Sequence, residues 1–239
     1  MRAAEAPKPR GEPPPRAGCT SSNCLEGAED FALAGGEALI VRGDVDRQTR
    51  DLDFFGLDTA TVDRLAPVAE QALREAGLNV ERILDNPGFV RFVVMNNEAR
   101  TEVDIASDAR LFPLEEHRGF RMLSGEELAV DKLLALFGRA EARDFVDLMA
   151  VEKTFGLDRL FRLASEKDRG FSAAVFAEMM DRFGRLRRDE FAVDDDQFDE
   201  LGRRVVRWRA KALEFDRQPS IEHNPDRGRD NDLGMGGPT

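Results

Sequence analysis

The sequence predicts an α+β protein, in which a small mixed β-sheet domain is followed by a C-terminal helical bundle. Two observations lead to this prediction. Before about residue 120, short runs typical of β-strands are interrupted by one long helical pattern. After that point, the apolar residues recur with the period of an α-helix. We therefore expect a sheet domain over residues 25–120 and a helical domain over residues 121–216.

The first half contains four runs that we expect to be strands. They cover residues 38–43, 50–57, 89–96 and 100–106. A helical pattern at 59–77 has Thr and Asp residues near its first turn and Gly77 at its end, which are common capping residues. Pro67 lies inside this pattern and marks either a break or a late start.

The second half begins with a helix signal, because Ser124 and Glu127 have the spacing of a capping box before an apolar run. Further helical patterns cover about 140–153, 157–167, 172–184 and 195–215. The last pattern contains Trp208 and five basic residues. It is typical of an amphipathic bundle helix with solvated charges, and contact with RNA is the alternative.

The two ends of the chain are rich in proline, glycine and polar residues. We expect a disordered leader over residues 1–24 and a disordered tail over residues 217–239. Cys19 and Cys24 both lie in the leader and are expected to be inert thiols in a reducing compartment. The N-terminus lacks an apolar signal region and no run approaches the roughly 18 apolar residues of a membrane span. These features predict a cytoplasmic protein without membrane contact.

The net charge of −12 disfavours broad, sequence-independent binding to nucleic acid, although it permits a local basic patch. Against this acidic background, the stretch "GGEALIVRGDVDRQTRDLDFF" from Gly35 to Phe55 combines paired glycines, three arginines and a D-x-D pair. Other D-x-D pairs occur in so acidic a chain, for example at Asp44 and Asp46 within the same stretch and at Asp194 and Asp196. The D-x-D spacing of Asp51 and Asp53 is therefore not informative by itself, and only the residues around the pair make it a candidate site.

Asp51 and Asp53 are two residues apart in an expected strand, so their carboxylates project from the same face. Such a pair is tolerable in water, as on a half-exposed edge strand, or around a cation, and Mg²⁺ often binds one or two carboxylates together with substrate phosphates. Asp104, in the expected strand "RTEVDIA", could supply a third carboxylate, and we prefer it to Glu102 because it lies deeper in the run. Three carboxylates on adjacent strands suit a two-metal site.

The residues around this pair have the chemistry of an anion site. Gly35 and Gly36, which we place after a helical segment and before a strand, allow backbone N–H groups to approach a phosphate closely. Arg42 and Arg47 can hold phosphate oxygens, and Thr49 adds a hydroxyl donor. Taken singly, either arginine is equally well a surface charge. Together with the carboxylates, these groups suit a metal-bound nucleoside triphosphate.

The stretch resembles the signature of the AbiEii/AbiGii-type nucleotidyltransferases, within the DNA polymerase β-like superfamily. That signature has a double glycine, an arginine, and then Arg-x-Ser/Thr-x-Asp-h-Asp, where h is apolar. A second stretch, "DKLLALFGRAEARDFVDLMAV" at residues 131–151, is similar to the downstream element of the same family. The resemblance covers about residues 28–155, with a looser helical correspondence to about 215. It departs from the family pattern at Glu37, where many members have a small hydroxyl residue.

The resemblance implies a role for each matching residue. Asp51, Asp53 and Asp104 would be catalytic carboxylates and metal ligands, and Lys132 would also be catalytic. The nucleotide-binding residues would be Gly35, Gly36, Arg42, Arg47, Thr49, Arg139, Arg143 and Asp147. In one continuous helix, Lys132, Arg139 and Arg143 would lie along one line. A glycine at 138 is a candidate break in that helix.

These observations predict a Mg²⁺-dependent nucleotidyltransferase that moves a nucleoside monophosphate from an NTP to an acceptor hydroxyl. The resemblance implies a toxin of a toxin–antitoxin pair, with RNA such as tRNA, or protein, as acceptor and with a cognate antitoxin as partner. Two alternatives stay open. One is a non-catalytic interaction protein that keeps the fold, which Glu37 and the acidic surface favour. The other is a small-molecule nucleotidyltransferase of the aminoglycoside-modifying kind.

Overall fold

The structure is a computed structural model that describes residues 31–49, 51–97 and 99–217. The expected leader (1–24), both cysteines, and the expected tail (217–239) except for Arg217 lie outside the described residues. The chain forms two compact units. Among the described residues, unit 1 contains 31–32 and 54–108, and unit 2 contains 33–53 and 109–217. The α+β class is confirmed, since strands and helices both contribute and most of the helices follow residue 120.

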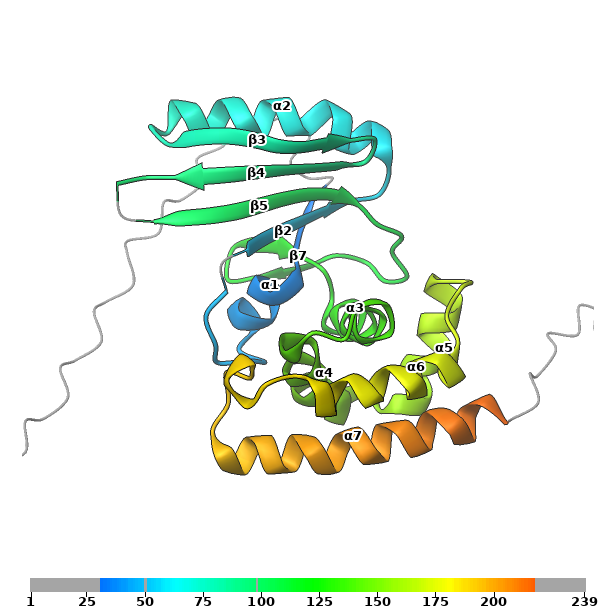
Figure 1. Ribbon diagram of the computed structural model, residues 1–239. Coiled ribbons are helices and arrows are strands. Elements are labelled where there is room, and N and C mark those ends of the chain that lie inside the picture. The colour runs from blue at the N-terminus through cyan, green and yellow to red at the C-terminus, as the bar shows by residue number, and fades with distance from the viewer. Residues whose placement is uncertain (1–30, 50, 98, 218–239) are drawn as a thin grey trace, which may run out of the picture. The chain divides into compact units, whose positions relative to one another are not determined.

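Unit 1 is an antiparallel sheet with one helix across it (Figure 1). Its elements are α2 (Thr59–Glu75), β3 (Asn79–Asn86), β4 (Phe89–Met95), β5 (Arg100–Ser107) and the last residues of β2 (Asp51–Gly56). The strands expected at 89–96 and 100–106 and the helix expected at 59–77 are confirmed. Asp58 caps α2 by accepting a hydrogen bond from Thr61 N, and Pro67 lies within the helix.

The two faces of this sheet differ in chemistry. Arg82 on β3 donates to Glu70 on α2 and lies over the ring of Phe92, its cross-strand partner on β4. The face of the sheet with Arg82 and Phe92 is therefore the one that α2 covers. Arg91 and Asp104 are cross-strand partners on β4 and β5, and alternation along each strand places them on the opposite face.

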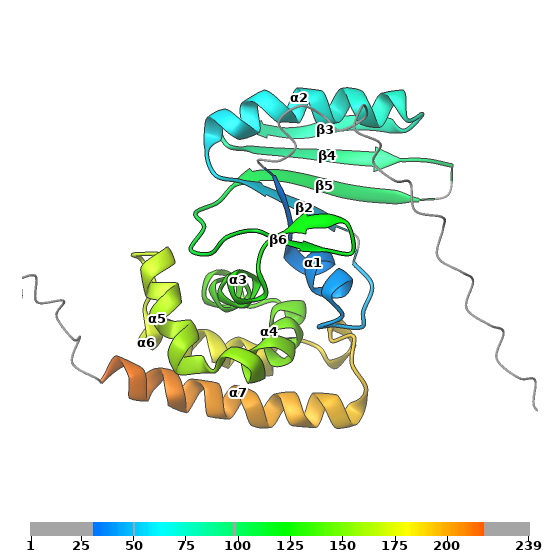
Figure 2. The ribbon, with the colours of Figure 1, turned by 180° about the vertical axis from the view of Figure 1, so that it is seen from behind.

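Unit 2 contains a short helix, three short strands and the helical bundle (Figures 1 and 2). Its first elements are β1 (Ala32–Ala34, whose first residue belongs to unit 1), α1 (Gly35–Arg42), the start of β2, β6 (Glu115–His117) and β7 (Phe120–Met122). The bundle contains α3 (Gly125–Gly138), α4 (Ala142–Phe155), α5 (Leu157–Lys167), α6 (Ala173–Met179) and α7 (Asp195–Asp216), with two 3₁₀ turns at Met180–Arg185 and Arg188–Glu190. β1 pairs in parallel with β7, and β6 pairs with β7 in antiparallel fashion.

The strand expected at 38–43 is wrong, because these residues form α1. Gly35 and Gly36 therefore follow a strand and begin a helix, which is the reverse of the expected order. Ala38 and Leu39 are fully buried and α1 packs against α3, so tertiary burial outweighs the β-propensity of the apolar run. The helix ends at Gly43, which has a left-handed conformation with φ of 83°.

The candidate break at Gly138 is present in the structure, so Lys132, Arg139 and Arg143 do not lie along one continuous helix. α3 ends at Gly138, Ala140 has a positive φ of 49°, and α4 begins at Ala142. A capping box between Glu141 and Asp144 starts the second helix. Because of the break, Lys132 on α3 and Arg143 on α4 do not share one helix face, and Arg139 lies between the two helices.

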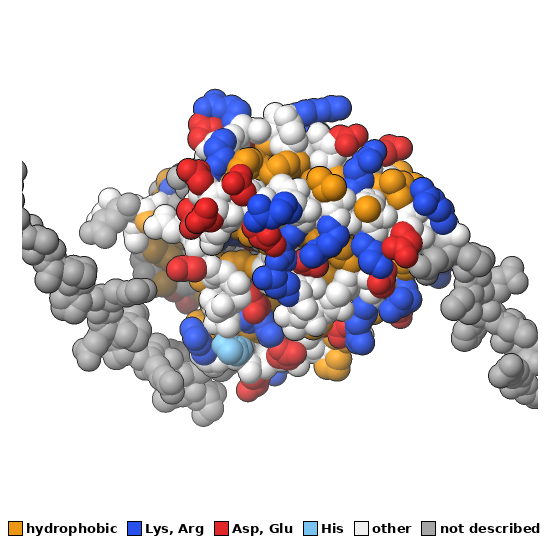
Figure 3. Space-filling model, turned by 90° about the horizontal axis from the view of Figure 1, so that it is seen from below, with side chains coloured by type: hydrophobic (Ala, Val, Ile, Leu, Met, Phe, Trp, Pro, Cys, Tyr) orange, Lys and Arg blue, Asp and Glu red, His pale blue; other side chains and the backbone are white. Residues whose placement is uncertain are grey.

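The bundle surrounds a core of aromatic rings. α7 runs along α4, α5 and α6 (Figure 1). Trp208 on α7 is fully buried. Seen from below, Lys and Arg side chains gather across the middle of the face, interspersed with acidic and hydrophobic side chains (Figure 3). On α7, Arg207 binds Glu152 of α4, and Lys211 binds Asp158 of α5. These contacts favour the bundle-helix interpretation of α7. Among the described helices, none combines the length and apolar character that a membrane span requires.

Candidate active site

The double glycine of α1 lies directly against two side chains of its own sequence motif. A Cβ atom on Gly35 would lie 1.8 Å from Oδ2 of Asp53, and a Cβ atom on Gly36 would lie 2.6 Å from Nη2 of Arg47. Gly35 also has a positive φ of 62°. A side chain at Gly35 would therefore be strained and would displace the Asp53 carboxylate, and a side chain at Gly36 would displace the Arg47 guanidinium. The geometry joins the start of α1, the Asp53 carboxylate and the Arg47 guanidinium into one site within unit 2.

Asp147 holds two cations of this site. Its side chain is fully buried, and its two oxygens accept hydrogen bonds from Nε and Nη2 of Arg47 at 2.9 and 2.8 Å. Nζ of Lys132 lies 2.9 Å from Oδ2 of the same carboxylate. Arg47 and Lys132 are themselves nearly buried, with side chains 9% and 8% exposed. We call these three residues the Asp147 hub; with two cations and one carboxylate, it carries one net positive charge.

The pKa of Asp147 reflects this environment. Burial is the strongest influence and by itself would raise the pKa of the carboxyl group. The hydrogen bonds from Arg47 and the charge of Lys132 together outweigh burial and hold the pKa of Asp147 below its usual range. Asp147 is therefore ionised at neutral pH, and its role in the structure is to fix the two cations.

Asp51 is bound by an arginine from the bundle. Nη1 of Arg143, in the first turn of α4, lies 2.6 Å from Oδ2 of Asp51, and Nε of Arg143 donates to Glu141. Burial lowers the pKa of the Arg143 guanidinium, but the hydrogen bond to Asp51 contributes to a net increase. The positive charge beside the Asp51 carboxylate is therefore the guanidinium of Arg143.

Arg139, the other arginine near the α3–α4 break, does not bind Asp51. It donates through Nε and Nη2 to the buried carboxylate of Asp144, at 2.9 and 2.8 Å. The hydrogen bonding of Arg139 to Asp144 is the main cause of the raised pKa of Arg139, and the nearby charge of Asp53 adds to it. Arg139 is therefore anchored at the start of α4, and the charge of Asp53 on β2 acts on it.

Two other predicted phosphate ligands have different partners in the structure. Arg42, at the end of α1, donates to Asp44 and Glu115, and its Nη2 would lie 2.4 Å from a Cβ on Gly125. Thr49 hydrogen-bonds with the backbone of Asp51 through its hydroxyl group, at 3.4 and 3.5 Å. Both residues support the loop between α1 and β2.

Asp104 belongs to unit 1, where it is almost buried on β5. Its two oxygens accept hydrogen bonds from Nε and Nη2 of Arg91, both at 2.6 Å. Arg91 and Asp104 are cross-strand partners on the face of the sheet opposite α2, so this bidentate contact joins β4 to β5. Sequence reasoning missed Arg91, as well as Glu141 and Asp144; an Arg placed opposite Asp104 becomes visible only when the strand register is known.

The described residues contain no group of three or more His, Cys, Asp or Glu side chains already arranged around a metal position. Asp51 and Asp53 nevertheless have the donor chemistry for a hard divalent cation, because they offer carboxylate oxygens from one face of a strand. The close contact of Asp53 with Gly35 keeps that carboxylate beside the start of α1. These two residues fit a divalent metal.

Comparisons with known proteins find a matching family model and similar solved structures. The family model described as "Nucleotidyl transferase AbiEii toxin, Type IV TA system" matches residues 22–230. The nucleotidyltransferase toxin MenT4 from Mycobacterium tuberculosis has 17% identity, with 78% of each chain covered and a TM-score of 0.52, which shows a shared fold. A provisionally assigned nucleotidyltransferase from H. pylori has 18% identity over 78% of this chain and 86% of that one, with a TM-score of 0.44. The comparison with curated proteins gives no match.

Proposed function

Because the chain belongs to the AbiEii family of nucleotidyltransferase toxins, we propose that it transfers a nucleoside monophosphate from an NTP to an acceptor hydroxyl with the help of Mg²⁺. The acceptor is an RNA such as tRNA, or a protein, and a cognate antitoxin restrains the activity in the cytoplasm. The reaction forms a bond between the acceptor oxygen and the α-phosphorus. The bond from the α-phosphorus to its bridging oxygen breaks, and pyrophosphate leaves.

The contact of Gly35 and Gly36 with Asp53 and Arg47 is the observation on which this proposal depends. α1 begins at these glycines, and Ala34 at its N-cap offers no side-chain acceptor to the first N–H groups. Free N–H groups at a helix start attract phosphate oxygens, and the helix dipole adds to this attraction. The triphosphate would thus lie at the start of α1, next to the carboxylates of β2.

The cations of unit 2 offset the charge of the triphosphate and of the departing pyrophosphate. The Asp147 hub supplies one net positive charge from Lys132 and Arg47, and its burial fixes both cations in advance. Arg139 and Arg143 supply two more guanidinium groups near β2. Arg42 and Thr49 are still predicted to contact the phosphates. In the structure Arg42 binds Asp44 and Thr49 binds the backbone of Asp51, and both bonds also support the loop between α1 and β2.

Asp51 and Asp53 would hold the metal. A bound Mg²⁺ neutralises phosphate charge and polarises the α-phosphoryl group. Asp104 remains the third carboxylate predicted from the sequence, and its role would be to accept the proton of the acceptor hydroxyl.

The test is label transfer from each α-³²P-NTP in the presence of Mg²⁺, total RNA and cell extract. We expect labelled product with wild type and at least a hundredfold less with Asp53→Asn, because an oxygen ligand is exchanged for an amide. Asp189→Asn, which changes an exposed carboxylate paired with Arg187, is the matched control and should retain activity. Nuclease and protease digestion of the product identify the acceptor class. Equal transfer by wild type and Asp53→Asn would refute the proposal.

A further inference from the structure

An ion pair between α4 and β2 involves one of the two carboxylates that we propose as metal ligands. Nη1 of Arg143 lies 2.6 Å from Oδ2 of Asp51, although the two residues are 92 positions apart in the chain. On its other side, the guanidinium donates through Nε to Glu141, the residue before α4, at 3.0 Å. Arg143 therefore lies between two carboxylates, one on β2 and one at the start of its own helix.

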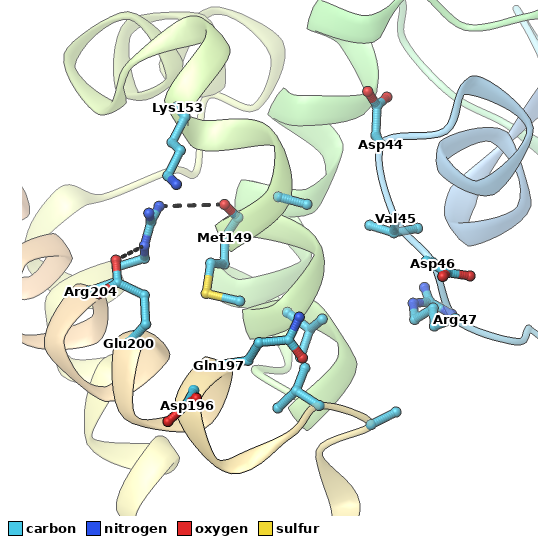
Figure 4. A pocket seen from close by; sticks show the side chains of 14 residues that line it. Asp44, Val45, Asp46, Arg47, Met149, Lys153, Asp196, Gln197, Glu200 and Arg204 are labelled. Carbon is cyan, nitrogen blue, oxygen red and sulfur yellow. Dashed lines mark hydrogen bonds and ion pairs between the residues drawn. The ribbon is translucent and has the colours of Figure 1, made fainter. Parts of the chain in front are cut away.

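Arg143 differs from the other arginines of the site in the burial of its partners. Arg47, which lines a pocket of about 500 Å³ (Figure 4), is held by the fully buried carboxylate of Asp147, and Arg139 is held by that of Asp144. The two partners of Arg143 are 33% and 51% exposed, and its own side chain is 42% exposed. Exposed ion pairs contribute little to stability, whereas breaking a buried pair is costly. Of these three arginines, Arg143 is therefore the one that a ligand displaces most easily.

The place of Arg143 in α4 also favours a negatively charged partner. Arg143 is the second residue of the helix, where the partial positive charge of the helix dipole disfavours a cation. The contact with Asp51 offsets this unfavourable position with a single negative charge. A triphosphate carries several negative charges and would offset it more fully.

A divalent cation and this guanidinium compete for Asp51. Oδ2 of the carboxylate already accepts a hydrogen bond from Arg143. A dication on the same carboxylate would meet the positive charge of Arg143 at close range. Coulomb repulsion of this kind weakens metal binding roughly tenfold, even at the dielectric constant of water.

We propose that Arg143 is a displaceable counter-ion of Asp51, which couples binding of the metal to binding of the triphosphate. Without nucleotide, Arg143 keeps the metal affinity of Asp51 low. When a triphosphate is bound, the guanidinium turns to the phosphate oxygens and leaves Asp51 to the metal. This inference rests on the proposed function, because it takes Asp51 as a metal ligand and a triphosphate as the anion. It goes beyond a general phosphate-binding role, since a residue that only binds phosphate would not lower the metal affinity.

The test consists of two titrations of the full chain, each with one ion alone. Mn²⁺, as a paramagnetic substitute for Mg²⁺, is followed by electron paramagnetic resonance of the free ion, and tripolyphosphate is followed by calorimetry in the presence of a chelator. Arg143→Gln should tighten Mn²⁺ binding about tenfold, because Asp51 loses a competing cation. The same variant should weaken tripolyphosphate binding about fivefold, because the phosphates lose a guanidinium partner. Damage to the fold would not tighten one ion while it weakens the other.

Arg187→Gln is the matched control, because it removes an arginine from an exposed ion pair with Asp189, and it should change neither affinity. A double-mutant cycle then tests whether the effect acts through Asp51. On an Asp51→Asn background, Arg143→Gln should no longer tighten Mn²⁺ binding.

Equal Mn²⁺ affinities of wild type and Arg143→Gln would overturn the inference, and so would equal tripolyphosphate affinities. An undiminished gain in Mn²⁺ affinity on the Asp51→Asn background would also overturn it, because the charge of Arg143 would then act without Asp51. None of these results depends on label transfer. A failure of this inference is therefore distinguishable from a failure of the proposed function, which is the absence of label transfer by wild type.

Discussion

Replacing Asp147 by Asn tests whether the hub is the buried anchor that the geometry indicates. The substitution keeps the size of the side chain but removes the negative charge that both Arg47 and Lys132 contact. The new amide retains one oxygen acceptor, while its NH₂ group would face a cationic donor. Two nearly buried cations then lose their counter-charge, which is the most costly way to break an ion pair.

The expected loss of stability follows from this burial. Removal of one partner from a buried ion pair costs about 3–5 kcal/mol. With one hydrogen bond retained by Asn, we expect a loss of about 3 kcal/mol in the free energy of unfolding. For a chain of this size, that corresponds to a decrease in Tm of about 6–12 °C.

The loss should depend on pH. Since the pKa of Asp147 in the folded protein is below its usual range, its ionised form stabilises the fold above the unfolded pKa of about 3.9. This contribution is lost as the pH falls through the lowered folded value. The difference between wild type and Asp147→Asn should therefore be full at pH 7 and pH 5 and should shrink below about pH 4.

The assay is urea unfolding followed by fluorescence of Trp208, the only tryptophan in the chain and a fully buried one. Asp189→Asn serves as the surface control, because its carboxylate is 64% exposed and its ion pair with Arg187 is worth about 1 kcal/mol or less. Nucleotidyl transfer is measured where both variants are more than nine-tenths folded. If Asp147→Asn costs less than about 1 kcal/mol, or if the cost is the same at pH 7 and pH 3.5, the hub is not a desolvated ion cluster and the reasoning fails.

Three further predictions concern the motif and the bundle. Gly35→Ala should reduce nucleotidyl transfer at least tenfold, because the added Cβ would displace Asp53; Gly138→Ala, where a Cβ meets no atom within 4 Å, should leave the rate unchanged in the same assay. Glu37→Ser should tighten NTP binding by about threefold to tenfold in calorimetry, because it removes a negative charge from the first turn of α1, and unchanged affinity would show that Glu37 does not face the phosphates. Glu152→Gln, which removes the buried partner of two arginines of α7, should lower the free energy of unfolding by about 3 kcal/mol in urea titration, and a loss below about 1 kcal/mol would contradict the buried pairing.

The sequence was most informative where chemistry depends on spacing along one element. The i, i+2 spacing of Asp51 and Asp53 placed both carboxylates on one strand face, and the structure has a strand there. The capping-box spacing of Ser124 and Glu127 correctly located the start of α3, where the Ser124 side chain accepts a hydrogen bond from Glu127 N. These signals are local, since each depends on a few adjacent residues and on backbone geometry that hardly varies between proteins.

The sequence was misleading where local propensity competed with burial. The run "ALIVRG" has the composition of a strand, yet it forms α1 because Ala38 and Leu39 bury their side chains in packing that includes α3. The sequence left open whether Lys132 and Arg143 share one helix. The break after Gly138 separates them, so that Lys132 binds Asp147 and Arg143 binds Asp51. Helix packing and turn conformation, rather than residue type, decide both outcomes.

By itself, the sequence determined the fold class, the family, and the residue types of the site, because motif spacing and hydrophobic period are properties of short segments. Only the tertiary structure decided which charges meet: Arg47 and Asp147 are 100 residues apart in the chain and share two hydrogen bonds, and Gly36 leaves the space that Arg47 occupies. The physical reason is desolvation. Whether a charge finds a buried partner or remains in water depends on distant elements that pack around it, and a one-dimensional pattern does not record that packing.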